Sequence, residues 1–142
     1  MKRIIVSVFA VAILAGLLAA PAFAAVKHFA GNVNGGGRVA FDVQFNNGKP
    51  RVAGLFVLRQ IPVSCDEGDT LAGYSTKNAV NVTNKRKFTY RFNFGQAGTA
   101  TIRGRISKNG KRASGITTAN IDLSPTDNNC TTGGPLRWNA SR

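Results

Sequence analysis

Residue types that carry most enzyme chemistry are scarce in this sequence. Its 142 residues include six acidic side chains and a single histidine, His28, which has no acid or thiol close to it in the sequence. Asp42 and Asp122 are the only acids on predicted strands, whereas glycoside hydrolysis needs two carboxylates that flank one bond. The sequence does not show that these two converge, so we predict a protein that is not an enzyme and uses no cofactor. An extracellular hydrolase is the alternative if the two carboxylates meet.

Helical periodicity is also absent beyond residue 24. Apolar residues alternate with polar ones instead, and Asn- and Gly-rich turns separate the alternating segments. Segment 52–61 is apolar on both faces, which predicts a central strand covered on each side. About eight strands with turns between them predict an all-β fold, an antiparallel β-sandwich of the jelly-roll kind. The expected strands are 27–33, 39–45, 52–61, 79–83, 88–94, 100–107, 111–123 and 136–140.

A long hydrophobic run occurs only at the N-terminus. Residues 4–20 are apolar, with two basic residues before them and a proline and an Ala-Phe-Ala triplet after them. This order is typical of a secretory signal sequence and predicts that residues 1–24 are removed. A retained membrane anchor is the alternative, because no charge interrupts 4–26. Cleavage leaves a single secreted domain, 25–142, without a transmembrane segment.

Only two cysteines are present, Cys65 and Cys130, and both lie in the predicted mature chain. An even number of cysteines in an exported protein predicts a disulfide, whereas two separate buried thiols are typical of the cytosol. A bridge across a loop of this length contributes roughly 4 kcal/mol of stability in the loop-entropy treatment.

Positive charge greatly exceeds negative charge. The chain has 19 Lys and Arg against six Asp and Glu, and loss of the signal sequence leaves 17 against six, a net charge of +11. In the hairpin of the two strands 88–94 and 100–106, a loop over 95–99 puts both apolar sets on one face. This register places Arg91 opposite Arg103 on the other face. Nine basic residues then gather at one end of the sheet and along its outer face: Lys85, Arg86, Lys87, Arg91, Arg103, Arg105, Lys108, Lys111 and Arg112.

These nine cations have no interleaved acid, and like charges that face each other cost stability. They indicate a binding surface for an anion, although a charged surface that only keeps the protein soluble is the alternative. Outside a cell the expected partners are anionic cell-envelope or extracellular polymers, and binding should weaken with salt. Cytoplasmic nucleic acid is not an expected partner, because the rings of 87–94 face away from the cations and offer no stacking platform.

Four of the six acids flank the cysteines in the sequence: Asp66, Glu67, Asp69 and Asp127. Carboxylate and amide oxygens on loops are the ligands that Ca²⁺ prefers. A carbohydrate-binding or calcium-dependent jelly roll that uses these loops is therefore an alternative function. The segment lacks the EF-hand loop pattern, so we predict no metal site and expect the acids to pair with arginines or to cap turns. They should lie at the opposite end of the sheet from the basic residues.

Four short segments carry a family resemblance: Cys130-Thr131-Thr132-Gly133, Trp138-Asn139-Ala140, Val63-Ser64-Cys65 and Ala113-Ser114-Gly115. Over roughly 29–140 the chain resembles a family of small, exported, uncharacterised bacterial proteins that is frequent in actinobacteria. That family has a Phe-rich strand set, a Cys-x-Thr-Gly segment and a closing Trp-x-Ala. The resemblance implies an all-β sandwich, export and a paired Cys65–Cys130, and it implies no activity. Trp138 should fill the core, or alternatively offer an exposed ring for stacking on sugars.

Overall fold

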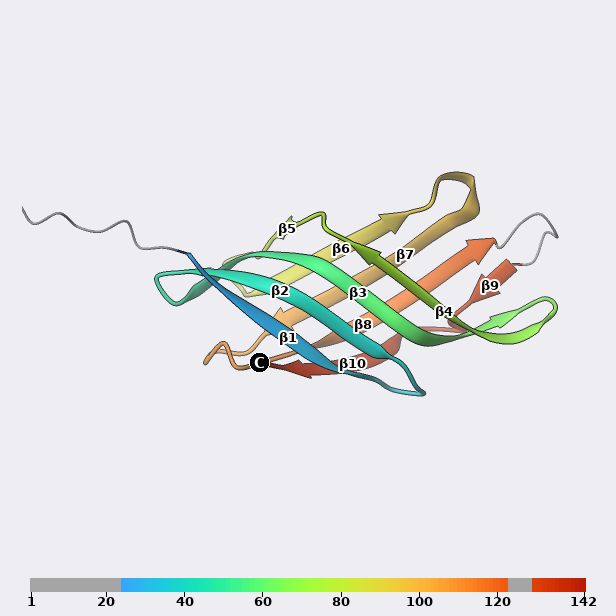
Figure 1. Ribbon diagram of the computed structural model, residues 1–142, viewed down its shortest axis with the longest axis horizontal. Coiled ribbons are helices and arrows are strands. Elements are labelled where there is room, and N and C mark those ends of the chain that lie inside the picture. The colour runs from blue at the N-terminus through green and yellow to red at the C-terminus, as the bar shows by residue number, and fades with distance from the viewer. Residues whose placement is uncertain (1–23, 123–128) are drawn as a thin grey trace, which may run out of the picture.

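Most of the described chain is in β-strands. The computed structural model describes residues 24–122 and 129–142, and residues 1–23 of the predicted signal sequence lie outside this part (Figure 1). No helix among the described residues could cross a membrane. The described strands are β1 (Ala25–Val33), β2 (Arg38–Asn46), β3 (Lys49–Cys65), β4 (Gly68–Thr76), β5 (Val80–Asn81), β6 (Lys87–Asn93), β7 (Gly98–Ile106), β8 (Arg112–Asp122), β9 (Asn129–Thr131) and β10 (Leu136–Ser141).

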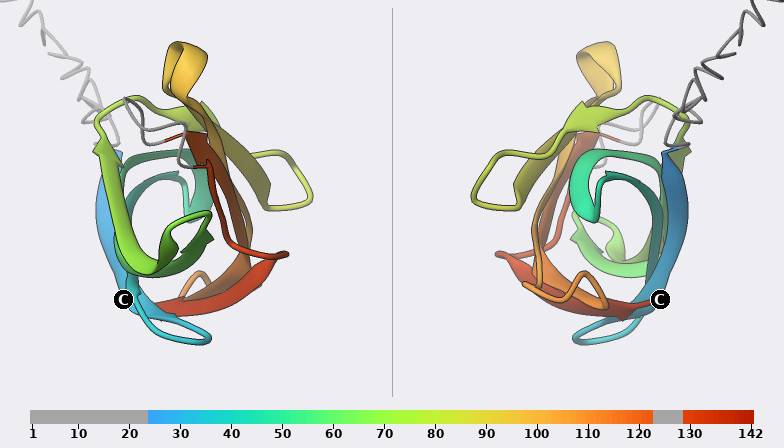
Figure 2. Two further views of the ribbon diagram at one scale, coloured as in Figure 1. Left: turned by 90° about the vertical axis from the view of Figure 1, so that its right-hand side faces the viewer. Right: turned by 90° about the vertical axis from the view of Figure 1, so that its left-hand side faces the viewer.

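The strands close into a barrel rather than forming two packed sheets. β1, β2, β3, β9, β8 and β10 follow one another in an antiparallel ring, because β10 pairs with both β1 and β8, and β9 joins β3 to β8. β4 and β5 pair with the other edge of β3, and β7 and β6 continue the sheet from β8. Figure 2 shows the ring nearly end on. The predicted jelly-roll-like β-sandwich of about eight strands is therefore wrong.

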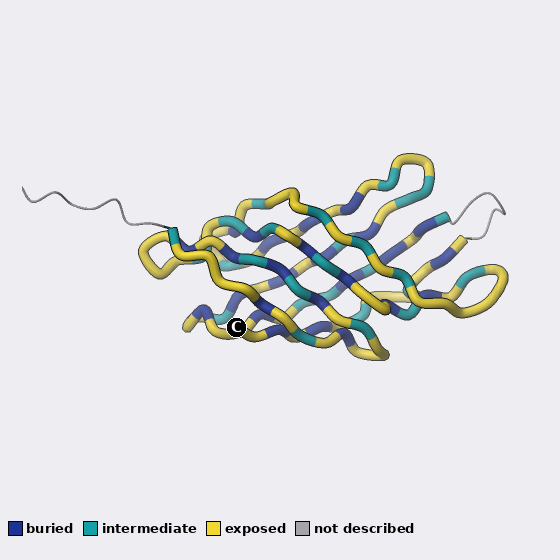
Figure 3. Tube along the Cα trace, viewed as in Figure 1, coloured by how far each residue is buried: buried dark blue, intermediate teal, exposed yellow. Residues whose placement is uncertain are grey.

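Strand patterning alone does not distinguish these two architectures. In a sandwich and in a small barrel alike, apolar side chains point inward and alternate with polar ones that point outward. Buried and exposed residues alternate in this way along the strands of the barrel (Figure 3). The difference lies in which strands share an edge, and β10 joins two strands that are distant in sequence. Two strands also carry little signal, since β4 alternates small and polar residues around Tyr74 and β9 has only three residues.

β3 is bent, which corrects the prediction of a central strand covered on both faces. Leu55 and Gln60 have positive φ angles of 49° and 55°, and the pairing of β3 with its neighbours shifts register beside each of them. An extra residue at each bulge resets the alternation. Phe56 and Ile61 are consequently buried, whereas Leu55 is 40% exposed. The continuous apolar run 52–61 thus belongs to a one-sided strand, and two bulges interrupt the run.

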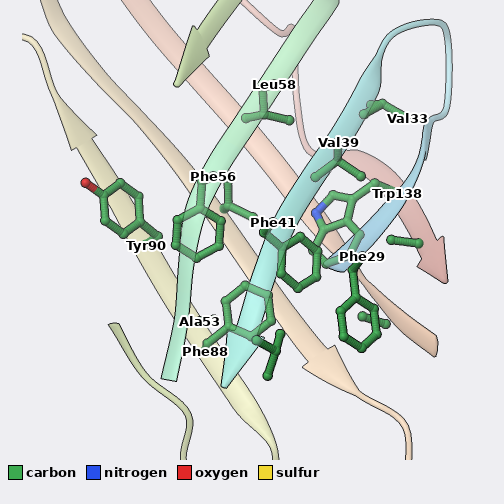
Figure 4. Packing of buried hydrophobic residues seen from close by; sticks show 14 of the residues in the cluster. Phe29, Val33, Val39, Phe41, Ala53, Phe56, Leu58, Phe88, Tyr90 and Trp138 are labelled. Atoms are coloured by element: carbon green, nitrogen blue, oxygen red, sulfur yellow. The ribbon is translucent and has the colours of Figure 1, made fainter. Parts of the chain in front are cut away.

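Aromatic rings fill the barrel interior around Trp138. The Trp138 side chain is 1% exposed, and its ring centre lies 5.7 Å from that of Phe41 in an edge-on arrangement. Phe41 in turn lies 5.3 Å from both Phe29 and Phe88 (Figure 4). Burial of one large apolar side chain stabilises a fold by about 1.5–3 kcal/mol. Trp138 is therefore a core residue, and the alternative of an exposed sugar-stacking ring is wrong.

Two glycines make room for this tryptophan. Gly104 of β7 and Gly115 of β8 are cross-strand partners. A β-carbon on either would collide with the Trp138 ring, and one on Gly104 would also collide with Phe88. The absence of side chains at this pair lets the largest residue of the core lie directly against the barrel wall.

The hairpin of β6 and β7 keeps its predicted faces, but its register differs by two residues. Phe88 rather than Tyr90 lies opposite Gly104, and the connecting loop is 94–97. A shift of two residues leaves every side chain on its original face. Phe88, Tyr90 and Phe92 are accordingly buried, as predicted.

Cys65 and Cys130 form the predicted disulfide. They are cross-strand partners on β3 and β9 and lie 65 residues apart in the sequence. Because β9 is short and joins β3 to β8, the bridge holds the shortest strand of the ring in place.

Replacing both cysteines with serine should lower the free energy of unfolding by about 4 kcal/mol, because the crosslink restricts the unfolded chain. Urea unfolding of the wild type and of the Cys65→Ser/Cys130→Ser variant, each with and without a reducing agent, measures this loss. The reducing agent should destabilise the wild type alone. A wild type that is equally stable when reduced would contradict the role assigned to the bridge.

Gly104→Ala should lower the free energy of unfolding by about 1–3 kcal/mol, because the added methyl group overpacks the core against Phe88 and Trp138. Adding Phe88→Leu to this variant should restore part of the loss. Thermal unfolding compares both variants with Ser114→Ala, a control on the exposed face of β8. A Gly104→Ala protein as stable as the control would refute this packing.

Candidate anion-binding surface

Three connections lie at one end of the barrel, on the left in Figure 1. They are the turn between β2 and β3, the turn between β5 and β6, and the turn between β7 and β8. The C-terminus lies at the same end, where the backbone N–H of Arg142 donates to the carbonyl oxygen of Lys111 at 3.2 Å. Arg142 also places its guanidinium 5.6 Å from the centre of the Phe45 ring.

The turn between β5 and β6 holds Arg86 in a defined position. The backbone N–H of Thr83 donates to the carbonyl oxygen of Lys87 at 2.9 Å, and the Thr83 hydroxyl accepts the N–H of Lys87 at 3.1 Å. Arg86 has a φ of 59°, which residues other than glycine rarely adopt. Its Nε donates to the carbonyl oxygen of Ile106 at 3.2 Å. The half-buried Arg86 side chain is therefore anchored beside the turn between β7 and β8.

A groove of about 980 Å³, termed here the first groove, crosses the outer face of β1, β10, β8 and the end of β7. Its cationic side chains are Arg86, Arg105, Lys108 and Arg112. Its amide side chains come from β1, the turn after it and β10: Asn32, Asn34 and Asn139. Small residues, among them Gly31 and Ser114, also line it. The first groove thus combines concentrated positive charge with uncharged hydrogen-bonding groups.

A second groove, of about 250 Å³, adjoins the first. The start of β3 contributes Lys49 and Arg51, and the turn between β5 and β6 contributes Thr83 and Asn84. Arg86 and Lys108 line both grooves, so these two residues stand on the border between them. Cations from three separate segments of the chain, residues 49–51, 86 and 105–112, therefore converge on one continuous surface.

The structure brings seven of the nine predicted basic residues to this end of the barrel. Besides the four that line the first groove, Lys87 is the cross-strand partner of Arg105, and Lys85 and Lys111 adjoin groove residues in the sequence. Arg91 and Arg103 lie farther along the outer face and line neither groove. The expected pairing of these two is wrong, because the register places Arg91 opposite Thr101.

Sequence reasoning missed Lys49, Arg51 and Arg142. The turn that precedes Lys49 was predicted from Asn46-Asn47-Gly48, but nothing local indicates which end of the barrel a turn occupies. Successive antiparallel strands send their turns to alternating ends. Alternation over the eight predicted strands sends the turns at 46–51 and 108–110 to the same end, but it does not show that the two turns lie side by side.

The cations of this surface have no acidic partners within the described residues. The ion pair that the described residues form lies elsewhere. It joins His28 Nδ1 to Asp42 Oδ1 at 2.8 Å, on the outer face of β1 and β2. Asp122, the other candidate for acid–base chemistry, instead ends β8 beside Asn129 of β9. Burial raises the pKa of the hydroxyl of Tyr74, a partly buried residue that packs against the core.

The acids near the disulfide lie at the other end of the barrel, as predicted (Figure 1). Asp66 and Glu67 form the turn between β3 and β4, Asp69 follows in β4, and Asp127 lies outside the described residues. A carboxylate oxygen of Asp66 accepts the backbone N–H of Asn129 at 3.1 Å. Across 24–122 and 129–142, no three His, Cys, Asp or Glu side chains are grouped so that they could hold a metal ion.

No family model matches this chain, and neither the curated proteins nor the solved structures contain a match. The resemblance to small exported bacterial proteins stays a prediction.

Proposed function

We propose that this protein is an exported, non-enzymatic module that binds anionic polymers of the cell envelope or the extracellular space through the two grooves. Export is supported by the signal-like residues 1–24 and by the Cys65–Cys130 disulfide, since disulfides persist in oxidising compartments. The resemblance to exported bacterial proteins agrees with this placement.

The proposal depends on one observation: cations from separate segments of the chain converge on one surface. Six basic side chains line two adjoining grooves: Lys49, Arg51, Arg86, Arg105, Lys108 and Arg112. None of the six is paired with an acid in the part of the chain that the structure describes. Charges that only keep a protein soluble favour a dispersed arrangement, because crowding raises their mutual repulsion. An anionic ligand in the grooves would remove this repulsion.

The arrangement of the two adjoining grooves also favours a polymer over a small anion. The two grooves share Arg86 and Lys108, so a chain that leaves one groove can enter the other and keep contact with cations. Multiple weak contacts along one flexible ligand add up to useful affinity. Such binding weakens with salt, because screening shortens the range of each contact.

Removing three groove cations should weaken binding to heparin, used as a model polyanion, by about ten- to hundredfold at low salt. The variant is Arg105→Gln/Lys108→Gln/Arg112→Gln, and titration calorimetry or fluorescence anisotropy measures its affinity. The matched control, Arg59→Gln/Lys77→Gln/Arg91→Gln, removes the same charge from exposed residues outside both grooves. Equal losses in the two variants would mean that net charge, and no site, governs binding.

Arg86→Asn should weaken heparin binding several-fold while the free energy of unfolding changes by less than about 1 kcal/mol. Asparagine tolerates the left-handed backbone at this position, and that relief offsets the lost bond to Ile106. Arg91→Asn is the control for the loss of one positive charge. An Arg86→Asn protein that unfolds much more readily, or that binds heparin as the wild type does, would contradict the role given to Arg86.

A further inference from the structure

We propose that the first groove selects an acidic polysaccharide, in which charged sugars and neutral hydroxylated sugars belong to one chain, over anionic polymers that lack sugars. This inference rests on the proposed function and names the class of polymer. It depends on the two kinds of side chain that line the groove and on their separate positions.

The first groove has a cationic part and an amide part. Arg105, Lys108 and Arg112 come from β7, β8 and the turn between them, and Arg86 joins them there. The amides of Asn32, Asn34 and Asn139 come from β1, the turn after β1, and β10. A bare polyphosphate has only acceptor oxygens, so it could use the N–H groups of these amides but would leave their oxygens without a donor. Amides donate and accept hydrogen bonds, which suits sugar hydroxyl groups.

Strand pairing sets these two parts at a defined spacing. One row of residues in register runs across five strands, from β6 to β1: Lys87, Arg105, Ser114, Asn139 and Asn32. All five are exposed on the outer face. Neighbouring strands are about 4.8 Å apart, so the row is about 19 Å long. This length exceeds a single carboxylate or phosphate group and suits a short run of linked units.

The amide groups are available for a ligand. Within 24–122 and 129–142, the side chains of Asn32, Asn34 and Asn139 make no hydrogen bond to other protein groups. At the cationic part, one donor of Arg86 is used by Ile106, and its remaining N–H groups are uncommitted. Both parts of the groove therefore present unused polar groups on the same surface.

Neutral polysaccharides should bind poorly. Aromatic rings that stack on sugars often give carbohydrate sites their affinity, and no aromatic residue lines either groove among the described residues. The attraction between the groove and its ligand must then come mainly from the cationic side chains, and the amides distinguish one anionic polymer from another. The ligand needs both a negative charge and sugar hydroxyl groups.

The test compares three polymers on the intact chain: a hyaluronan oligosaccharide, in which carboxylated and neutral sugars alternate, a polyphosphate of equal charge, and neutral dextran. The variant is Asn32→Ala/Asn139→Ala, and its matched control is Asn78→Ala/Asn120→Ala, which changes exposed asparagines outside both grooves. Removal of the two groove amides should weaken hyaluronan binding about tenfold. Polyphosphate binding should weaken much less, because phosphate oxygens only accept hydrogen bonds and cannot use the amide oxygens, and the control should alter neither.

The outcomes separate this inference from the function on which it rests. A selective loss of hyaluronan binding supports both. If hyaluronan and polyphosphate bind but the groove amides matter for neither, the polysaccharide inference is wrong and the proposed function stands. If neither anionic polymer binds at low salt, the proposed function is wrong as well. Dextran that binds as tightly as hyaluronan would overturn the requirement for charge. Thermal unfolding of each variant confirms that the changes act on binding and not on folding.

Discussion

Closure of the sheet through β10 is the constraint on which the rest of this structure depends. β10 is short, yet it pairs with β1 on one side and β8 on the other, and it delivers Trp138 to the centre of the core. The tryptophan fits because Gly104 and Gly115 carry no side chains where its ring meets the wall. With the interior filled by aromatic rings, cationic side chains on β6, β7 and β8 have no place except outside.

The same closure builds the candidate site. Because β10 pairs with both β1 and β8, it brings the amides of Asn32 and Asn139 beside the cations of β7 and β8. Arg86 depends on packing in the same way, because its Nε is held by the backbone of β7. The groove is therefore a product of how the barrel closes, while each side chain in it occupies an ordinary outward position on a strand or turn.

The sequence was sufficient for properties that local pattern determines. Alternation on β6 and β7 identified the buried rings and the outward cations, and an error of two residues in register left both faces correct because the strand period is two. The paired cysteines were also predictable from their number and from the expected export. Properties that depend on pairing between strands distant in sequence could not be predicted in this way. The sandwich was wrong because β10 joins strands distant in sequence. Lys49 and Arg51 were missed because the alternation of turns gives the end of the sheet at which a turn lies but not which turns lie side by side there, and closure of the barrel decides that.

The most direct test of the account is an NMR titration of the ¹⁵N-labelled mature chain with a short hyaluronan or heparin oligosaccharide at low salt. The central claim is that one continuous surface, from the amides of β1 and β10 to the cations beside Arg86 and Lys108, receives an anionic chain. The account predicts that shifted amide signals gather in β10, β8 and the turns at 83–87 and 107–112, and that they return to their free positions when salt is raised. Shifts centred on the disulfide end, or spread evenly over all cationic residues, would contradict it.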